Sequence, residues 1–270
     1  MSPVIVIILA AGEGRRMGRL TQGLPKCLVP VHGVPLLYRS LEGVQKASLH
    51  DVCDVCIVAG YCSERLRGQV RSLPFDGNVH LCLNPRFAST NNAISLQIAL
   101  EAHPDQSFIL MDGDLLFDEV LLRRLLLDSR PDLMVVEEGR GQLNEEAMKV
   151  VVDPANHQIQ VIGKNIPLHR ASGEFIGMAK FSKAWSAKLW EALNLLASDK
   201  VSQNLYYEDM IQKLIPSSPP LYALPVNGLR WSEIDTFEDL QQAEELWSRE
   251  GKRMRPSTED RRMHRRPLQG

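Results

Sequence analysis

The sequence predicts an α/β protein in which helices flank a mostly parallel central sheet and a smaller β-rich region follows. Three observations favour this class. Residues 4–9 form an uninterrupted apolar run, which is typical of a parallel strand covered on both faces. Strand-like and helix-like segments alternate up to residue 128, as they do in βαβ units. After residue 128, short strand-like segments follow one another with few helices between them.

In the first half, apolar spacing and capping residues indicate where the helices lie. Leu37, Leu41 and Val44 recur on one face of a helix predicted over 35–47. Thr90 is a suitable N-cap for a helix that ends near residue 102. A further helix is predicted at 63–72, and further strands are predicted at 51–59, 79–83 and 107–111.

The second half is predicted to begin with strands and to end with helices. The sequence Asp-Pro-Ala-Asn at 153–156 signals a hairpin turn. Thr236 and Asp239 stand where a capping box would open a last helix that ends near residue 247. The strands are predicted at 133–138, 148–152, 159–162 and 175–181, and the other helices at 183–197 and 206–214.

The composition of the chain changes at residue 249. Residues 1–248 are predicted to form one domain with two halves, 1–128 and 129–248. The tail 249–270 carries eight basic and three acidic side chains and has almost no apolar periodicity. We therefore predict a disordered tail, and contact with an acidic neighbouring subunit is the alternative.

Composition and charge exclude several classes of protein. The 270 residues are 44% hydrophobic and 24% charged, which excludes a wholly disordered, collagen-like or coiled-coil chain. A net charge of -2 provides no field that would recruit nucleic acid or an anionic membrane, so neither partner is expected. No apolar run approaches the ~20 residues that span a bilayer. The five cysteines are odd in number, which argues against a disulfide framework and favours the cytoplasm.

A glycine-rich turn leaves the first strand and carries two arginines. Gly12 and Gly14 allow consecutive backbone N–H groups to surround an anion. Arg15 and Arg16 can add bidentate phosphate contacts, although Arg15 can equally be a solvated surface residue. The turn fails the dinucleotide fingerprint because Met17 stands at its third glycine position, and it lacks the Walker motif. A Rossmann dehydrogenase is therefore a weak alternative.

The residues that follow this turn distinguish it from other glycine-rich turns that bind phosphate. They read Leu-Thr at 20–21, Pro-Lys-Cys-Leu-Val-Pro-Val at 25–31 and Gly-Val-Pro-Leu at 33–36. With the turn, this pattern resembles the sugar-phosphate nucleotidyltransferase superfamily. The resemblance implies a Rossmann-like fold whose first half binds a nucleoside triphosphate and whose second half binds an acceptor. It also implies catalytic roles for Arg16, on the β- and γ-phosphates, and for Lys26, on the α-phosphate. The base and phosphates would be held by Leu9, Ala10, Ala11, Gly12 and Gly14.

Two carboxylate motifs are candidates for binding a metal ion. Asp112-Gly113-Asp114 follows a predicted strand, at the edge where open α/β sheets bind ligands. Asp235 lies in Glu-Ile-Asp-Thr, which begins at Glu233. The resemblance implies that Asp114 and Asp235 share Mg²⁺, with Asp112 beside the nucleotide and Glu233 in support. A turn at Asp112 and a charge at a helix N-terminus at Asp235 are the alternative reasons for these residues.

Residues 84–96 indicate a branch of this superfamily. They contain two adjacent asparagines and lack the glutamine and Gly-Thr-Ala usual in sugar-nucleotide enzymes. In this they resemble the cytidylyltransferases that activate phosphocholine and small phosphonates, such as 2-aminoethylphosphonate. Ser89, Asn91 and Asn92 can read the edge of a pyrimidine. Helix capping by Thr90 and Asn91 is the alternative, and both interpretations can hold together.

The residues expected to bind the acceptor lie in the second half. Lys149 and Lys164 would hold its anionic end, although strand lysines that merely face solvent are the alternative. An anionic head at the other end would require His169 and Arg170. A cationic head would require aromatic and acidic residues, for which Tyr206, Tyr207, Glu208, Asp209 and Trp231 are available. The expected acceptor-binding residues are Lys149, Lys164, Glu174, Tyr206 and Trp231.

Together these features predict a cytidylyltransferase that uses CTP and Mg²⁺ and transfers CMP to a small phosphonate or phosphomonoester. A sugar-1-phosphate nucleotidyltransferase is the alternative within the superfamily, and a non-catalytic regulatory homologue is the alternative outside enzymes. A homodimer is compatible with the sequence. Cys27 has no paired histidine that would make it a nucleophile. Cys53 and Cys56 form C-x-x-C without a second pair, which favours packing over zinc binding.

Overall fold

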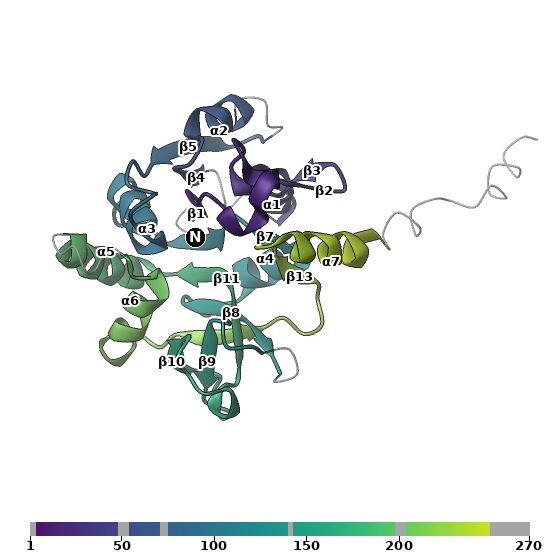
Figure 1. Cartoon of the computed structure of the whole chain (residues 1–270). Coiled ribbons are helices and arrows are strands. Elements are labelled where there is room, and N and C mark those ends of the chain that lie inside the picture. The colour runs from purple at the N-terminus through teal and green to yellow at the C-terminus, as the bar shows by residue number, and fades with distance from the viewer. Residues whose placement is uncertain (1–3, 48–53, 71–74, 140–142, 198–203, 249–270) are drawn as a thin grey trace, which may run out of the picture.

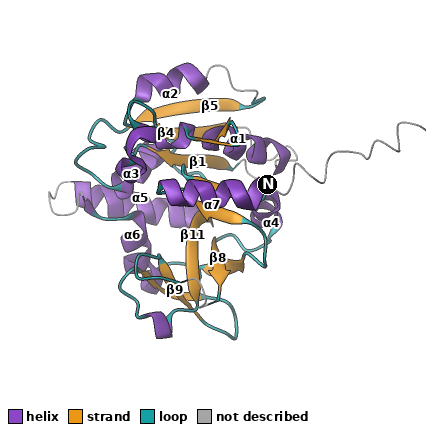
Figure 2. Cartoon of the chain, turned by 45° about the vertical axis from the view of Figure 1, so that its right-hand side comes forward, coloured by secondary structure: helices purple, strands orange, loops and turns teal. Residues whose placement is uncertain are grey.

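A computed structural model describes residues 4–47, 54–70, 75–139, 143–197 and 204–248, and a nine-stranded sheet forms the centre of this described part (Figure 1). The strand order is β10-β9-β11-β6-β1-β4-β5, with β8 paired to β11 and β12 paired to β8. Helices lie on both faces of the sheet (Figure 2). The predicted fold class is therefore confirmed, whereas the tail 249–270 lies outside the described residues.

The parallel part of the sheet places two chain turns at one edge. Strand β1 (Ile5–Ala10) lies between β4 (Asp54–Ala59) and β6 (Phe108–Asp112), and β5 (Asn78–Leu83) follows β4. All of these pairs are parallel. The order β5-β4-β1-β6 reverses direction at β1, and open α/β sheets bind ligands where such a reversal occurs, beyond the carboxyl ends of the strands. Every residue of β1 is buried, as its apolar run predicts.

The helices divide into two groups, one on each face. Trp185 and Tyr207 pack in the core of one face, and Leu41, Leu66 and Leu121 pack in the core of the other. The first face is covered by α3 (Asn92–Ala102), α5 (Lys183–Ala197) and α6 (Tyr207–Leu214). The second face is covered by α1 (Leu36–Ala47), α2 (Ser63–Val70) and α4 (Glu119–Leu127). Helix α4 was not predicted. It begins at the N-cap Asp118, whose side chain accepts a hydrogen bond from Val120 N at 3.2 Å.

The strand that joins the two halves is β11 (Gly173–Phe181), which is antiparallel to β6. Its first residues extend past β6 and pair with two strands of the second half. Both predicted halves therefore contribute strands to one sheet. The other strands of the second half are β8 (Leu133–Glu138), β9 (Lys149–Val152), β10 (Ile159–Gly163) and β12 (Tyr222–Pro225).

A short two-stranded ribbon connects distant parts of the chain. Strand β7 (Leu115–Phe117) is antiparallel to β13 (Trp231–Glu233), and helix α7 (Phe237–Ser248) follows. The predicted capping box is confirmed: Thr236 N donates to Asp239 Oδ2 at 2.7 Å, and Asp239 N donates to Thr236 Oγ1 at 3.1 Å. The remaining short elements are η1 (Arg15–Thr21), η2 (Lys26–Leu28), β2 (Pro30–Val31), β3 (Val34–Pro35), η3 (Leu168–Arg170) and η5 (Ile215–Ser217). Among the described residues, no helix has the length and apolar content needed to cross a membrane.

Candidate active site

The glycine-rich turn after β1 and the acidic turn after β6 lie side by side, because the two strands are parallel neighbours. Leu9 pairs with Asp112 in register, and Gly113 N donates to Leu9 O at 2.9 Å. A Cβ atom at Gly113 would lie 2.7 Å from that oxygen, so the close approach requires glycine. Gly14 begins η1 with φ +64°, and a Cβ there would lie 3.1 Å from the Lys26 side chain. The two turns and Lys26 therefore belong to one site.

Four residues that the sequence assigns to catalysis and metal binding form one ion-pair cluster. Lys26 Nζ donates to Asp114 Oδ2 at 2.6 Å and also to Asp235 Oδ1. Arg16 Nη2 donates to Asp235 Oδ2 at 2.6 Å. The Lys26 side chain is only 11% exposed, so its ion pairs are screened less by water and salt than pairs on an open surface.

The ribbon explains how Asp235 reaches this cluster from the far end of the chain. Asp114 precedes β7, and Asp235 follows β13. Glu233 pairs with Leu115 in register, and Ile234 N donates to Asp114 O at 3.1 Å. The Asp235 side chain bonds Lys26, whereas the following helix is capped by other residues. Asp235 is therefore not the residue that caps α7.

The carboxylates of this cluster fit a hard divalent cation. One oxygen each from Asp114, Glu233 and Asp235 lies within 4.8 Å of the others. Within the described part of the chain, Asp114 Oδ1 is buried and has no hydrogen-bond partner. A buried oxygen without a partner is unfavourable, and a cation with oxygen ligands would satisfy it. The residues present thus fit the Mg²⁺ that the sequence predicts. Glu233 was expected only to support the metal ligands, but its carboxylate lies close enough to Asp114 and Asp235 to be a ligand itself.

The charges of the cluster shift the pKa values of its members in opposite directions. Burial lowers the pKa of Lys26, but the carboxylates of Asp114 and Asp235 outweigh burial and raise it above its ordinary value. Burial raises the pKa of Asp235, but Lys26 and Arg16 outweigh it and lower that pKa. Burial of the Glu233 carboxylate, together with the charges of Asp114 and Asp235, raises its pKa to about 8. Lys26 and Arg16 therefore balance the charges of Asp114 and Asp235, and a further cation in the site would favour the ionised form of Glu233.

A cavity of about 380 Å³ lies beside the glycine-rich turn. Most of the residues predicted to bind the nucleotide line it: Leu9, Ala11, Gly12, Gly14, Arg16, Lys26, Asn91, Asn92 and Asp112. Two do not line it. The Ala10 side chain is buried in the core, and exposed Ser89 donates from its hydroxyl to Arg86 O at 3.2 Å. Arg15 also lines this cavity and forms an ion pair with Glu13.

The two adjacent asparagines hold neighbouring helices in place. Asn91 Oδ1 accepts from Asn92 N at 2.8 Å and caps α3, so the capping interpretation is confirmed for Asn91. Asn92 Oδ1 accepts from Tyr207 N at 2.9 Å and thereby joins α3 to α6. Buried Asn84 was not singled out, although it holds the loop before α3 through Thr90 Oγ1 (3.2 Å) and Ser95 Oγ (3.1 Å). The sequence did not assign Asn84, Phe87, Thr90 or Ser95 to the nucleotide, and Tyr206, which it assigned to the acceptor, also lines this cavity.

A second cavity of about 540 Å³ adjoins the first on the other side of the ion-pair cluster. Arg16, Asp114 and Asp235 line both cavities. Four of the five residues predicted to bind the acceptor line the second cavity: Lys164, Glu174, Tyr206 and Trp231. The Lys164 ammonium lies 4.8 Å from the centre of the Tyr206 ring. The two cavities therefore adjoin at the ion-pair cluster, which contributes charged side chains to both.

Comparison with known proteins assigns this arrangement to a family. The MobA-like NTP transferase domain matches residues 6–214. The chain belongs to this family. The predicted nucleotidyltransferase is thereby confirmed, and so is its similarity to cytidylyltransferases of phosphonates and phosphocholine.

Two relatives are similar to this nucleotidyltransferase in sequence, and one solved structure is similar to it in fold. The CTP:phosphoglutamine cytidylyltransferase of Campylobacter jejuni is 23% identical over 87% of the chain and 97% of the relative. The CMP-5'-(3-aminopropyl)phosphonate synthase of Streptomyces rubellomurinus is 28% identical over 90% of the chain but only 38% of that longer relative. The structure of the CTP:phosphocholine cytidylyltransferase of Streptococcus pneumoniae shares the fold, with a TM-score of 0.72 and 23% identity over 90% of this chain and 99% of that one.

The structure contradicts the prediction that Lys149 binds the acceptor. Its side chain is fully buried, and Nζ donates to Asn144 O (3.3 Å), Glu145 O (2.9 Å) and Ala147 O (3.3 Å). A lysine whose donors are used by backbone carbonyls cannot grip an acceptor. Neither interpretation of the strand pattern holds, because Lys149 faces neither substrate nor solvent.

Glu208 is a buried acidic residue in the wall of the second cavity. The sequence offered it only as one of several residues available to a cationic head. Glu208 is 5% exposed, lines the cavity and leaves Oε2 without a partner among the described residues. Burial raises its pKa to about 7. Asp112 accepts from the Tyr207 hydroxyl at 3.1 Å, and burial followed by the charge of Glu208 holds the pKa of Asp112 well above its ordinary value. The burial of Glu208 could be found only from the folded structure.

Proposed function

We propose that this nucleotidyltransferase is a CTP-dependent cytidylyltransferase that transfers CMP to a small phosphonate, or to a phosphomonoester such as phosphocholine, and releases pyrophosphate. The observation that carries the proposal is the ion-pair cluster of Arg16, Lys26, Asp114 and Asp235, which lies between two adjoining cavities. A reaction that joins a nucleotide to an anionic acceptor needs its balancing charges at this boundary. The relative and the solved structure named as CTP cytidylyltransferases support CTP as the nucleotide.

The proposed chemistry is an in-line displacement at the α-phosphorus of CTP. An ionised oxygen of the phosphonate or phosphate attacks, and a new phosphorus–oxygen bond forms. The bond from the α-phosphorus to the oxygen bridging to the β-phosphate breaks, and pyrophosphate leaves with the electron pair. The nucleophile is already ionised at neutral pH, so no general base is required. The tasks left to the protein are to position the reactants and to neutralise charge.

Each charged residue of the cluster has a distinct role in this proposal. Lys26 binds the α-phosphate, and Arg16 binds the β- and γ-phosphates. Asp114 and Asp235 would hold Mg²⁺, which supplies charge that offsets the phosphate oxygens when it is bound. Lys26 Nζ bonds both of these carboxylates. A metal held by Asp114 and Asp235 would supply positive charge to them and leave Lys26 free to bind the phosphate.

The composition of the acceptor cavity favours an acceptor with a cationic head. Lys164, which pairs with Glu146 at 3.9 Å, is the candidate for the anionic end, and the acidic side chains of Glu174 and Glu208 line the remainder. Tyr206 and Trp231 add aromatic faces, which attract ammonium groups. The alternative anionic head lacks support, because neither His169 nor Arg170 lines this cavity. We therefore propose an amine or choline head, as in aminoalkylphosphonates or phosphocholine.

A pyrophosphate-release screen tests the proposal directly. The full chain is assayed with Mg²⁺ and CTP, UTP, dTTP or GTP, each with phosphocholine, 2-aminoethylphosphonate or glucose 1-phosphate. We expect release with CTP and one of the two zwitterionic acceptors. Preference for UTP or dTTP with glucose 1-phosphate would instead identify a sugar-1-phosphate nucleotidyltransferase. A lack of release with every pair would favour a non-catalytic regulatory homologue.

A further inference from the structure

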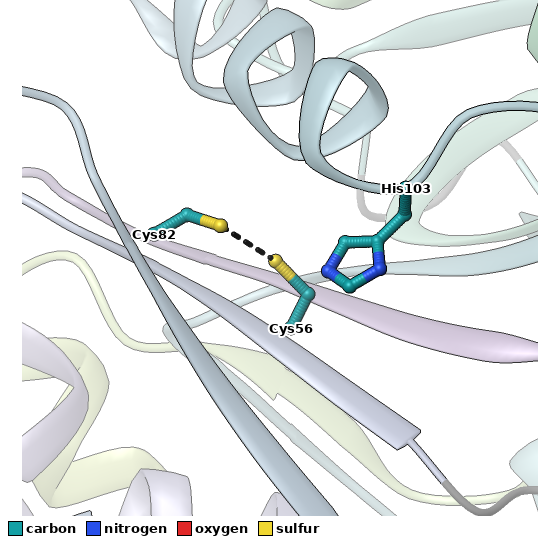
Figure 3. Close-up of side chains that lie close together, drawn as sticks. All are labelled: Cys56, Cys82 and His103. Atoms are coloured by element: carbon teal, nitrogen blue, oxygen red, sulfur yellow. Dashed lines mark hydrogen bonds between the residues drawn. The ribbon is translucent and has the colours of Figure 1, made fainter.

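Three side chains that the proposed reaction does not use come together away from both cavities (Figure 3). They are Cys56 of β4, Cys82 of β5 and His103, the C-cap of α3. The Cys56 thiol donates to Cys82 Sγ at 3.5 Å. The two sulfur atoms and one ring nitrogen of His103 all lie within 4.8 Å of one another. Cys53, the other cysteine of the C-x-x-C pattern, lies outside the described residues, and Cys56 contacts Cys82 instead.

The parallel sheet and the path of α3 explain why these residues meet. In the register of β4 and β5, Cys56 pairs with His80 and Val58 pairs with Cys82. Because side chains alternate across a strand, Cys56 and Cys82 project from the same face of the sheet. Cys56 belongs to the core that α3 covers on that face, and Cys82 packs against it. His103 ends α3, and Figure 3 shows its ring directed toward Cys56.

The donor set and its spacing are those of a soft-metal site. Tetrahedral zinc sites use thiolates at about 2.3 Å and imidazole nitrogens at about 2.0 Å, which places two sulfur ligands about 3.8 Å apart. The Cys56 and Cys82 sulfurs at 3.5 Å need to move little to reach that separation. A disulfide would instead require about 2.05 Å. The carboxylate cluster of the active site consists of oxygen ligands and suits a different, harder cation.

The His103 ring has an unfilled bonding requirement. Within the described structure, its Nε2 is buried and has no hydrogen-bond partner. Burial, followed by the neighbouring His80, lowers the pKa of His103 and favours the neutral ring that can bind a metal. A buried ring nitrogen without a partner is unfavourable, and a metal would satisfy it.

We propose that Cys56, Cys82 and His103 form a binding site for a thiophilic divalent cation, with zinc as the expected occupant and solvent as the fourth ligand. The site would join two strands to the end of α3. Cys82 and His103 stand on either side of 84–102, the segment that contributes Asn84 and Asn92 to the nucleotide cavity. A bound metal would therefore fix both ends of that segment. The proposal does not depend on which nucleotide or acceptor the enzyme uses.

The test measures metal bound to the reduced full chain. Protein freed of metal by a chelator is titrated with Zn²⁺, with Mg²⁺ in excess to occupy the carboxylate cluster, and bound zinc is counted after gel filtration. We expect one equivalent per chain at micromolar zinc. Replacing zinc with Co²⁺ should give the thiolate-to-cobalt charge-transfer band. Both signals should be lost in Cys82→Ser and His103→Asn and kept in Cys62→Ser, a matched control outside the cluster.

Three results would overturn the proposal. Reduced wild-type protein that binds no zinc and gives no cobalt–thiolate band would show that the three residues only pack together. This measurement needs no variant, so a variant that misfolds does not remove the test. Equal zinc binding by wild type and by correctly folded Cys82→Ser and His103→Asn would place the metal elsewhere. A Cys56–Cys82 disulfide that forms in air equally fast with and without zinc would also overturn it, because ligated thiolates resist oxidation.

Discussion

Replacing Lys26 by methionine removes the cation at the centre of the proposed active site and keeps most of the side-chain volume. The change leaves Asp114 and Asp235 facing each other with Glu233 nearby, and of the cations bonded to these carboxylates in the described structure only Arg16 remains. Two consequences follow from this geometry. Catalysis loses a charge that would stabilise the transition state, and the folded state loses the balance of its carboxylates.

The structure sets the expected sizes of both effects. Removing one preorganised donor of this kind lowers kcat about 100- to 1,000-fold. The side chains of Lys26, Asp114 and Asp235 are 11%, 21% and 19% exposed. The cost to stability should therefore lie between the ~0–1 kcal/mol of a surface pair and the ~3–5 kcal/mol of a fully buried one. A value of about 2 kcal/mol corresponds to a fall in Tm of about 4–8 °C.

The assay combines pyrophosphate release with thermal unfolding, each with and without Mg²⁺. We expect Lys26→Met to lose turnover, and we expect Mg²⁺ to raise its Tm more than that of the wild type, because the metal replaces the missing positive charge. Lys46→Met is the matched control: Lys46 is half-exposed and pairs with Glu42 and Glu119 on the surface. Near-normal turnover in Lys26→Met, or a Tm that responds to Mg²⁺ no more than in the wild type, would refute the reasoning.

Three further predictions concern the metal, the acceptor and pH. Asp235→Asn should abolish Mg²⁺-dependent turnover, whereas Asp118→Ala, which removes an N-cap of α4 that lines neither cavity, should lower stability by ~1 kcal/mol and leave turnover intact; equal activities would exclude Asp235 as a ligand. Lys164→Ala should raise the acceptor KM about 10- to 100-fold and leave the KM for CTP unchanged. Lys149→Met should lower Tm and leave both KM values unchanged. Titrating CTP and the acceptor separately for each variant tests both expectations. Burial raises the folded-state pKa of Glu208 to about 7, so the folded chain binds more protons than the unfolded chain between about pH 4.5 and 7, and stability should fall as pH rises through that range. Glu208→Gln should flatten this part of the Tm–pH curve, and an unchanged slope would assign the dependence to other groups.

Local patterns were sufficient to predict most of the first half of the fold. The apolar run of β1 and the spacing of Leu37, Leu41 and Val44 are properties of adjacent residues, and each predicted its element. Helix α4 was missed although Asp118 is a good N-cap, because its leucines were not recognised as a helical face. Strand β12 was also missed. Its four residues are too few for an alternating pattern to be distinctive.

The candidate site was predictable where a motif carried it and unpredictable where only tertiary packing did. Lys26 and Asp235 were identified from motifs, and the ribbon places them in contact. Lys149 failed because alternation along β9 gives the face of a side chain but not the atoms its end will meet, here three backbone carbonyls. The packing predicted for Cys56 is confirmed by its place in the core, but its contact with Cys82 was not predicted, because its nearest cysteine in sequence is Cys53. Non-local contacts of this kind leave no periodic signal in one sequence.

The ribbon of β7 and β13 also bears on how the site responds to local opening. The two strands of the ribbon are joined by three residue pairs, fewer than join most neighbouring strands of the central sheet. Two-stranded ribbons have little stability of their own. Opening of this ribbon would separate Asp114 from Asp235 while β1 and β6 stay paired. A ligand that bridges the two carboxylates binds only the closed form, so its measured affinity includes the free energy of keeping the ribbon closed. Amide hydrogen exchange at Glu233 and Ile234 would slow as such a ligand binds, which makes these two amides reporters of an assembled site.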